Sequence, residues 1–575
     1  MRLSIIPTKN DKQYYVIREV YLEDIKKNKT FITEKLGLES KIRERLGGED
    51  PQKWAKAYVA KLNRQEAENT REIIIRLKQD VLIEKDTEQT VNCGYLFLQD
   101  LYHRLGIHRI AESIQRKYKF VYNLDSILSR LVYCRILFPS SKKATYEHSK
   151  KFVEKPDFAA HDIYQSLDVI AKESDFIQAE LYKNSVKMSK RNTGILYYDC
   201  TNYYFEKTVA EGNQQYTQNS KDHKPNPVVQ MGLFMDGDGV PLAFDIYDGN
   251  ANEQTTLKPL EEKIFEDFAL SRFVLCTDAG LSSDSNRKFN HVAGRSFVTV
   301  QSIKKLPEYM QKWALDPNGF RLEGSKQIYN VEAIDEEEHQ HSIFYKEIID
   351  HQDADLQQRL IVTYSVKYRD YLRAVRKGQI ERARKDIEKN PKKAKKPRPN
   401  DPSRFIRNDH VTSTGEIADQ VHRSMDNATV EYEEKYDGYY AVCTDLKDPV
   451  AIIIKINKRR WMIEECFRIM KNEFLARPVF LIRPERIKAH FTTCFMALMV
   501  YRYLERMLED KFTYCKIIDG LREMFLLIEH NVGYRPAYAR NDFTDALHET
   551  FGYRTDYEII TKKVMKNILK MTKKK

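Results

Sequence analysis

The chain has 575 residues, of which 42% are hydrophobic and 31% are charged. At roughly 150 residues per domain this length allows about three or four domains, and the composition excludes a globally disordered chain. Lys and Arg exceed Asp and Glu by 12, a balance that is compatible with polyanion binding without requiring it.

The sequence contains neither the pattern of a signal peptide nor an apolar run long enough to span a membrane. The N-terminus lacks the pattern of a signal peptide, and the apolar run 494–501 is too short to span a bilayer. The eight cysteines contain no CxxC pair, which argues against a zinc site or a disulfide framework. We therefore expect a cytoplasmic protein without a membrane partner.

The N-terminal third of the chain changes from strand-like to helical patterns. Alternating polar and apolar residues in 1–40 predict a small antiparallel sheet. Helical spacing of apolar residues dominates 41–190. Lysines near position 142 make this region a candidate DNA-binding module, and a helical scaffold with a solvated basic face is the alternative.

An α/β pattern follows. Residues 191–305 read as three strands, a helix, a strand, a helix and a strand, with Asp-Gly dipeptides at 236–239 that predict a hairpin. Residues 306–440 interrupt this pattern with strand-like runs, a charged helical stretch and a basic run typical of a flexible loop. Helical patterns dominate from about 449 to the end.

Two carboxylates occupy positions that favour strands. Asp199 interrupts the apolar sequence ILYYDCTNYYF at 195–205, and Asp278 ends the strand-like RFVLCTD. Ligands and catalytic groups collect at the carboxyl ends of strands in open α/β sheets. If these two strands pair, the two carboxylates lie side by side and repel each other unless a cation separates them.

A third acidic candidate lies in KRRWMIEECFRIMKNEF at 458–474. One helical stripe of this segment is apolar: Ile463, Phe467, Met470 and Phe474. A charged stripe lies about 100° around the helix from it: Arg460, Glu464, Arg468 and Lys471. Helix spacing alone favours an ordinary ladder of ion pairs.

The order Asp199, Asp278, Glu464 resembles the triad of DDE transposases of bacterial insertion sequences. The resemblance is to the insertion-sequence-four superfamily, in particular its sixteen-thirty-four group, whose signature reads Y-x2-R-x3-E-x6-K. Arg460, Glu464 and Lys471 match this spacing, whereas Asn457 stands at the tyrosine position. Other stretches also resemble the group, including YYDCTNYYFE, SKDHKP, GVPLAFDIYDGNANEQTTL, LCTDAG, GRSFVTVQS and DGYYAVCTDL, so the resemblance covers most of 90–505.

This resemblance implies an α/β fold with a ribonuclease-H-like catalytic core, a mixed sheet flanked by helices, interrupted by an insertion domain. N-terminal β and helical regions and a helical C-terminus accompany the core. The expected regions are 1–40, the N-terminal β region; 41–190, the candidate DNA-end-binding domain; 191–305, the first part of the core; 306–440, the insertion domain; 441–505, the second part of the core with the glutamate helix; and 506–575, a helical region with a possible role in dimerisation.

The resemblance also implies the chemistry. Asp199, Asp278 and Glu464 would hold two Mg²⁺ ions, for which Mn²⁺ can substitute, with Asp199 bridging both. Arg460, Lys471 and Arg468 would bind DNA phosphates. Asp222 and His223 in the SKDHKP loop are secondary candidates, for which a surface-loop role is the alternative.

The expected function is that of a DNA transposase. It would cut at inverted-repeat ends of an insertion sequence and join the 3′-hydroxyl ends to target DNA, as a homodimer on double-stranded DNA. A nuclease without strand transfer and a catalytically silent DNA-binding regulator are the alternatives. In the insertion, Trp313, Phe320 and Tyr329 are candidates for holding a flipped base, and the basic stretch 371–397 for following a phosphate backbone.

Overall fold

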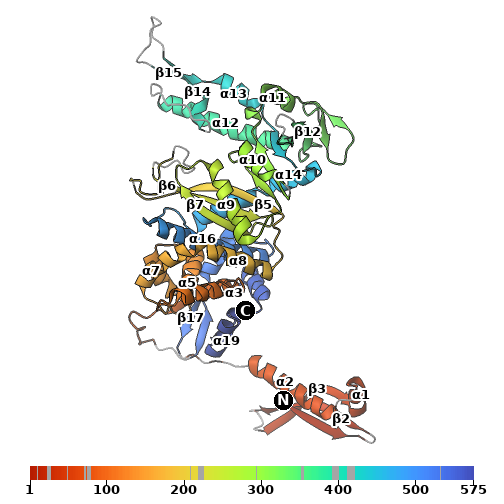
Figure 1. Cartoon of the computed structure of the whole chain (residues 1–575). Coiled ribbons are helices and arrows are strands. Elements are labelled where there is room, and N and C mark those ends of the chain that lie inside the picture. The colour runs from red at the N-terminus through yellow and green to blue at the C-terminus, as the bar shows by residue number, and fades with distance from the viewer. Residues whose placement is uncertain are drawn as a thin grey trace. The chain divides into compact units, whose positions relative to one another are not determined.

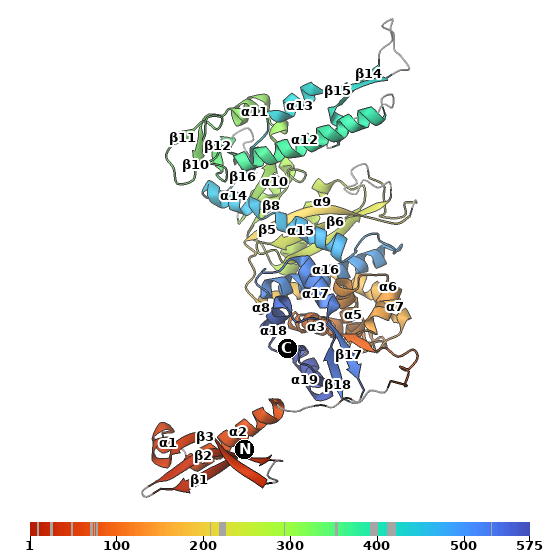
Figure 2. The same ribbon diagram turned by 180° about the vertical axis from the view of Figure 1, so that it is seen from behind.

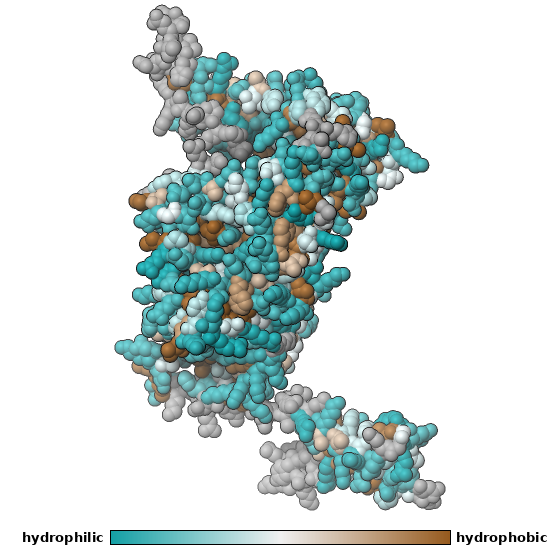
Figure 3. All heavy atoms as spheres, viewed as in Figure 1, coloured by the Kyte–Doolittle hydropathy of each residue, from teal (hydrophilic) through white to brown (hydrophobic). Residues whose placement is uncertain are grey.

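The computed structural model describes most of the chain. The residues outside the description are 9–10, 23–26, 48–49, 70–72, 74, 76–78, 208, 218–225, 293, 351–354, 391–400, 411–420, 531 and 575. The chain divides into two compact units, Met1–Thr87 and Glu88–Lys575. In the described part, no helix combines the length and apolar character needed to cross a bilayer, and the face of the large unit seen in Figure 3 is mostly hydrophilic.

The small unit is a three-stranded antiparallel sheet with two helices. Its elements are β1 (Arg2–Pro7), β2 (Lys12–Leu22), β3 (Lys27–Leu38), α1 (Glu39–Arg45) and α2 (Pro51–Asn69). Tyr14 of the sheet packs with Ile42 of α1 and Ala55 of α2 in a common core. The strands lie where the alternation predicts them, and the first two helices after residue 38 belong to the same unit.

The large unit contains a helical layer before its main sheet. Its helices are α3 (Tyr95–Arg104), α4 (Ile107–Tyr118), α5 (Leu124–Leu137), α6 (Lys142–Ser149), α7 (Ala160–Lys172) and α8 (Ser174–Met188). The long helix α16 (Pro484–Met507) packs against several of them, including α5 and α7. Figure 1 and Figure 2 both place these segments side by side, although the whole of the main sheet lies between α8 and α16 in the sequence.

The C-terminal region joins this layer. Its elements are α17 (Tyr514–Glu523), β17 (Phe525–Glu529), β18 (Gly533–Pro536), α18 (Asp542–Phe551), β19 (Ile560–Thr561) and α19 (Lys562–Thr572), and its strands pair with β4 (Thr90–Asn92) in the order β19-β18-β17-β4. Helices make up most of this region, as predicted, and the three short strands are an addition that the sequence pattern did not predict. Gly94 makes the junction possible, since a Cβ there would lie 2.0 Å from the Leu521 carbonyl oxygen.

A ten-stranded mixed sheet forms the centre of the large unit. Half of it comes from β5 (Ile195–Tyr204), β6 (Val228–Asp236), β7 (Pro241–Asp248), β8 (Phe273–Thr277) and β9 (Arg295–Gln301). These strands lie in the order β7-β6-β5-β8-β9, with β5, β8 and β9 mutually parallel and β6 antiparallel to both neighbours. The predicted α/β pattern of strands, helices and a 236–239 hairpin is confirmed.

Helices cover both faces of these strands. Tyr198 and Cys200 of β5 pack with α9 (Glu253–Phe268), whereas Tyr197 and Tyr203 pack on the opposite face, toward α14 (Val450–Lys458) and α16. Figure 1 and Figure 2 show α9 and α15 (Trp461–Arg468) on these two sides. Because both faces are covered, the strand sequence is nearly continuously apolar.

The segment between the two halves of the core extends the same sheet. It contributes β10 (Phe320–Leu322), β11 (Ile328–Tyr329), β12 (Phe344–Asp350), β13 (Gln358–Tyr364) and β16 (Tyr439–Thr444), the last of which pairs antiparallel with β9. Its other elements are α11 (Glu308–Leu315), α12 (Val366–Lys389), β14 (Ile406–His410), β15 (Val421–Met425) and α13 (Asn427–Glu434). The helix α10 (Asp284–Asn290) belongs to the first half of the core, between β8 and β9. Trp313, Phe320 and Tyr329, the predicted base-holding candidates, pack in the hydrophobic core of this segment.

Candidate active site

The register of two parallel strands brings Asp199 and Asp278 level. Ile195 of β5 lies opposite Val274 of β8, and the same register continues through Tyr197 and Cys276. Continued by two more positions, it sets Asp199 level with Asp278, which follows the last residue of β8 directly. The side-by-side placement that the sequence makes conditional on strand pairing is therefore the one found.

Asp199 lies on the face of β5 that is turned toward α15. Thr201, two residues further along the strand, accepts a hydrogen bond of 2.6 Å from Nζ of Lys471. Residues two apart on a strand share one face, so Asp199 is carried to the same side as this lysine. The Asp199 side chain is 8% exposed, and its Oδ1 accepts from the backbone N–H of Cys200 at 2.8 Å.

Asp278 is oriented by the turn that follows it. The backbone N–H groups of Gly280 and Leu281 donate to its Oδ1 at 2.9 and 3.2 Å. Gly280 leaves room for this arrangement, because a Cβ at that position would lie 3.3 Å from Oδ1 of Asp278 and 3.5 Å from Oε2 of Glu253. Glu253, the first residue of α9, is thus an acidic neighbour of the site that the sequence pattern did not single out.

Glu464 is carried by α15, which continues into one π-helical segment, η4 (Ile469–Glu473). The predicted apolar stripe is buried throughout: Ile463, Phe467, Met470 and Phe474 are each 5% exposed or less. Glu464 itself lies at the edge of the buried face, with a side chain that is 52% exposed. Nη1 of Arg460 lies 3.0 Å from its Oε1.

These groups line one open depression of about 390 Å³. Its lining contains all three predicted acids and all three predicted cations: Asp199, Asp278, Glu464, Arg460, Arg468 and Lys471. Thr201, Phe467, Asn472 and Arg477 complete it. The triad and the charged stripe, which are far apart in sequence, thus meet beside the middle of β5 and the carboxyl end of β8. Asp222 and His223 lie outside the described residues.

Arg460 is electrostatically linked to each acid of the depression. Burial would lower the pKa of Arg460, but Tyr440, Glu464, Asp278 and Asp199 together raise it. Its Nε is buried without a hydrogen-bond partner among the described residues. The guanidinium therefore acts as the shared counter-charge that allows three carboxylates to face one depression.

The acids are chemically suited to a hard divalent cation, since carboxylate oxygens are the ligands that Mg²⁺ prefers. Within the described ranges, however, no three acidic, histidine or cysteine side chains are close enough together to hold a metal ion. The Glu464 carboxylate is instead paired with Arg460, one turn before it along the chain. The donor set fits a hard cation in kind, and all three acids line the one depression; to share an ion, they would have to lie closer together than they do in this structure.

Several lining residues were not predicted. Thr201 follows Asp199 at a spacing of two, which is a strand signal that could have identified it. Arg477 lies after the helical stretch and reaches the site because the chain turns back there; its guanidinium lies 5.8 Å from the ring centroid of Tyr204. Asn472 belongs to the π-helical segment, whose altered register the ordinary helical spacing does not reveal.

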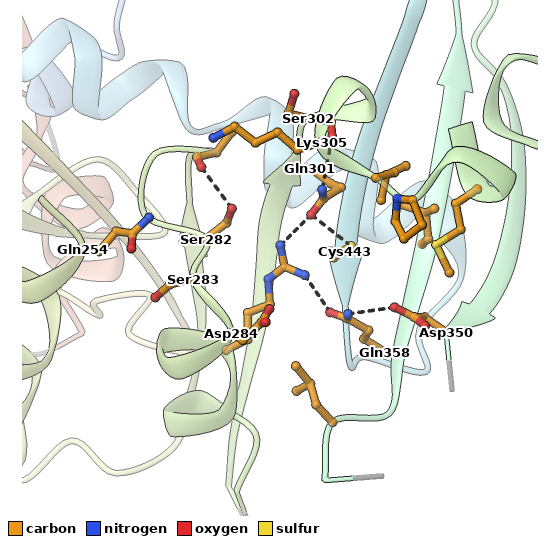
Figure 4. Close-up of a pocket in the computed structure, with 17 residues that line it drawn as sticks. Gln254, Ser282, Ser283, Asp284, Gln301, Ser302, Lys305, Asp350, Gln358 and Cys443 are labelled. Atoms are coloured by element: carbon orange, nitrogen blue, oxygen red, sulfur yellow. Dashed lines mark hydrogen bonds between the residues drawn. The ribbon is translucent and has the colours of Figure 1, made fainter. Parts of the chain in front are cut away.

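A second cavity of about 510 Å³ lies beyond the loop that follows Asp278 (Figure 4). Hydroxyl and amide groups from Ser282, Ser283 and Gln301 line it. The guanidinium of Arg287 donates to Gln301 at 2.5 Å and to Gln358 at 3.0 Å, which ties α10 to β9 and β13. These bonds join α10 to the sheet beside the loop that follows Asp278.

Comparisons with known proteins place the site residues within a family match. A family model described as "Transposase DDE domain" matches residues 192–500. Among solved structures, the piggyBac transposase synaptic complex with hairpin DNA matches at 8% identity and a TM-score of 0.36, over 83% of this chain and 84% of that one. The Mos1 transposase paired-end complex with left transposon end matches at 11% identity and a TM-score of 0.13, over 39% and 61%. No curated protein matches. TM-scores this low carry no argument, so the family match decides.

Proposed function

Because the chain belongs to the transposase DDE-domain family, we propose that it cuts DNA at the inverted-repeat ends of an insertion sequence and joins the 3′-hydroxyl ends to target DNA. The observation that carries this proposal is the single depression lined by three acids and three cations. The motif spacing favours the sixteen-thirty-four group of the insertion-sequence-four superfamily.

The strand order supports a ribonuclease-H-like core. In β7-β6-β5-β8-β9 the strands β5, β6 and β7 form an antiparallel meander, and β8 and β9 add parallel to β5. This order places β5 and β8 next to each other, so that Asp199 in the middle of β5 lies level with Asp278 just after β8. A rigid central position suits groups that must hold one geometry through a reaction.

The three acids differ in how firmly the surrounding structure holds them. Asp199 and Asp278 are fixed by strand pairing and by backbone N–H groups, whereas Glu464 is half-exposed on a helix. Two divalent cations held by these three carboxylates would activate the attacking oxygen and stabilise charge on the leaving oxygen. Water attacks in the first cut, and the freed 3′-hydroxyl attacks in strand transfer.

The cations bind the DNA strand. Arg460 offers a planar guanidinium that can contact two phosphate oxygens, and Lys471 offers a point charge held by Thr201. Arg468 lines the same depression. When a DNA phosphate pairs with Arg460 in place of Glu464, the Glu464 side chain becomes able to turn toward Asp199 and Asp278. Such contacts position the strand without reading its sequence.

Other parts of the chain would bind the rest of the DNA. The basic face of α12 would follow a phosphate backbone, and the region 41–190 or the N-terminal sheet would read the element ends. Two equivalent element ends favour a homodimer on double-stranded DNA.

The test uses the full chain, DNA carrying the element ends, and Mg²⁺ or Mn²⁺. We expect strand nicking followed by joined products, and Asp199→Asn should abolish both while DNA binding persists. Asp267→Asn, an exposed carboxylate on α9, is the matched control. Cutting without joined products would favour the nuclease alternative, and binding without any cutting the regulator. Cutting by Asp199→Asn at the wild-type rate would refute the triad.

A further inference from the structure

Tyr440 stands at the point where the inserted segment rejoins the central sheet. It lies on β16, opposite Thr363 of β13, and is partly buried. Its ring meets Tyr368 of α12 edge-on, with centroids 6.0 Å apart. Its hydroxyl accepts a hydrogen bond of 3.1 Å from Nδ2 of Asn457 on α14. A strand of the inserted segment and a helix of the core are thus joined through this phenol.

Asn457 is the position at which the chain departs from the transposase signature. It lies in the last turn of α14, and Arg460 lies in the turn that joins α14 to α15. The backbone N–H of Arg460 donates to the Asn457 carbonyl oxygen at 3.1 Å, so the two residues are neighbours across this turn. The Oδ1 of Asn457 is buried without a hydrogen-bond partner among the described residues. The helix therefore provides no hydroxyl here, and the neighbouring strand brings one to the same place.

The phenol also faces the guanidinium of the depression. Burial raises the pKa of Tyr440, while the hydrogen bond from Asn457 and the charge and hydrogen bonding of Arg460 act to lower it. Conversely, Tyr440 is the first among the groups that raise the pKa of Arg460 against the effect of burial. Tyr440 and the three acids thus act on the same guanidinium, although Tyr440 does not line the depression.

A phenol in this position has a clear physical role. The Arg460 pair with Glu464 is partly exposed, and such pairs hold a side chain only weakly. A long arginine side chain changes its orientation when the carboxylate paired with it moves, unless a second group holds the guanidinium in place. Tyr440 does not move with Glu464, because it is fixed in a sheet.

We propose that Tyr440 is the positioning residue of Arg460, and that it supplies from strand β16 the phenol that the helix lacks at Asn457. This inference rests on the proposed function. When Glu464 turns toward the other acids, Tyr440 keeps the guanidinium over the depression, where it meets the phosphate at the cutting site. The inserted segment thereby contributes a side chain directly to the alignment of the site.

The first experiment removes only the hydroxyl. We expect Tyr440→Phe to lower the single-turnover cleavage rate by about ten- to a hundredfold, the effect of losing one hydrogen bond to a charged group. The thermal midpoint and the DNA dissociation constant should stay close to those of the wild type. Tyr439→Phe is the control, because that hydroxyl points instead to the Leu315 carbonyl in the inserted segment.

The second experiment separates positioning from general support of the fold. In an Arg460→Lys background, which lacks the planar guanidinium, Tyr440→Phe should change the rate by less than about twofold, because coupled residues are not additive. Exchanging the pair, as Tyr440→Asn with Asn457→Tyr, should restore part of the rate lost in Tyr440→Asn alone.

Two results would overturn the inference. One is a Tyr440→Phe chain that cuts as fast as the wild type, and the other is a pair of losses, from Tyr440→Phe and Arg460→Lys, that multiply in the double variant. Either leaves the proposed function intact if Asp199→Asn is inactive. A wild-type chain that cuts no element-end DNA overturns the proposed function, and the role of Tyr440 with it.

Discussion

Arg460 holds Glu464 by an ion pair of 3.0 Å, one helical turn apart. The glutamate side chain is 52% exposed and the arginine 21%. A helical pair at this spacing contributes only a few tenths of a kcal/mol, and this one is partly exposed. Under the proposed function, a DNA phosphate can therefore displace Glu464 from Arg460 at little cost.

Removing the arginine should therefore affect chemistry more than folding. We expect Arg460→Ala to lower the cleavage rate by about ten- to a hundredfold and to change the free energy of unfolding by less than about 1 kcal/mol. Lys455→Ala, an exposed cation of α14 outside the depression, should leave both unchanged. Single-turnover cleavage and thermal unfolding measure the two effects. Wild-type cleavage by Arg460→Ala would remove Arg460 from the site.

The turn after β8 predicts a second sensitive position. A Cβ at Gly280 would lie 3.3 Å from the Asp278 carboxylate oxygen that accepts two backbone hydrogen bonds. Gly280→Ala should displace this carboxylate and lower cleavage at least tenfold, with a small change in the thermal midpoint. Gly378→Ala is the control, because nothing lies within 4 Å of its added Cβ and alanine favours a helix interior by roughly 0.5–1 kcal/mol. Equal activity of the two variants would contradict the prediction.

The sequence was sufficient to predict features that depend on the periodicity and side-chain chemistry of a single strand or helix. The alternation in 195–205, the carboxylate at the end of β8 and the two helical stripes of 458–474 each predict what one element does. Asp199 lies beside Asp278 because β5 and β8 pair in parallel. In the sequence these two strands are separated by β6, β7 and α9. Motif order could indicate that relationship by resemblance, but the residue spacing alone could not.

The missed features share a long-range cause. The short strand β17 pairs with β4, which lies at the opposite end of the large unit's sequence, and a short apolar run gives no sign of so distant a partner. Arg477 lines the depression, and Glu253 lies near Gly280 beside it, only because tertiary folding brings their segments to this place. The strands of the inserted segment were visible as strands, yet their addition to the core sheet through β16 and β9 depends on tertiary pairing.

The exposed face of α12 gives a prediction for DNA binding. Lys377 and Arg384 are exposed and two helical turns apart, which places them on one side of the helix. If this side follows a phosphate backbone, Lys377→Glu with Arg384→Glu should weaken binding of all DNA sequences alike. The slope of log K against log salt should fall by about one for each cation that no longer meets a phosphate. Lys562→Glu with Lys563→Glu, on exposed α19 positions, is the control. An unchanged slope would mean that the face is merely solvated.

A buried lysine predicts how folding responds to pH. Lys142 of α6 is 5% exposed, and its Nζ has no hydrogen-bond partner among the described residues. Burial, with a smaller effect from the charge of Arg135, lowers its pKa to about 7, while the thiols Cys494 and Cys134 act in the opposite direction. His490 of α16 lies in the same cluster, where burial and then Arg135 and Lys142 lower its pKa. Protonation of the Lys142 amine therefore destabilises the folded chain.

The sign follows from the proton balance. Between pH 7 and the ordinary lysine pKa near 10.5, the unfolded chain carries a proton on Lys142 that the folded chain lacks, so stability rises with pH by up to about 1.4 kcal/mol per unit. Lys142→Met should abolish this rise, and its gain over the wild type should be largest at or below pH 7. Thermal midpoints from pH 6 to 9 measure it, with the exposed Lys143→Met as the control. If Lys142→Met and Lys143→Met show the same dependence on pH as the wild type, Lys142 does not titrate in the folded chain.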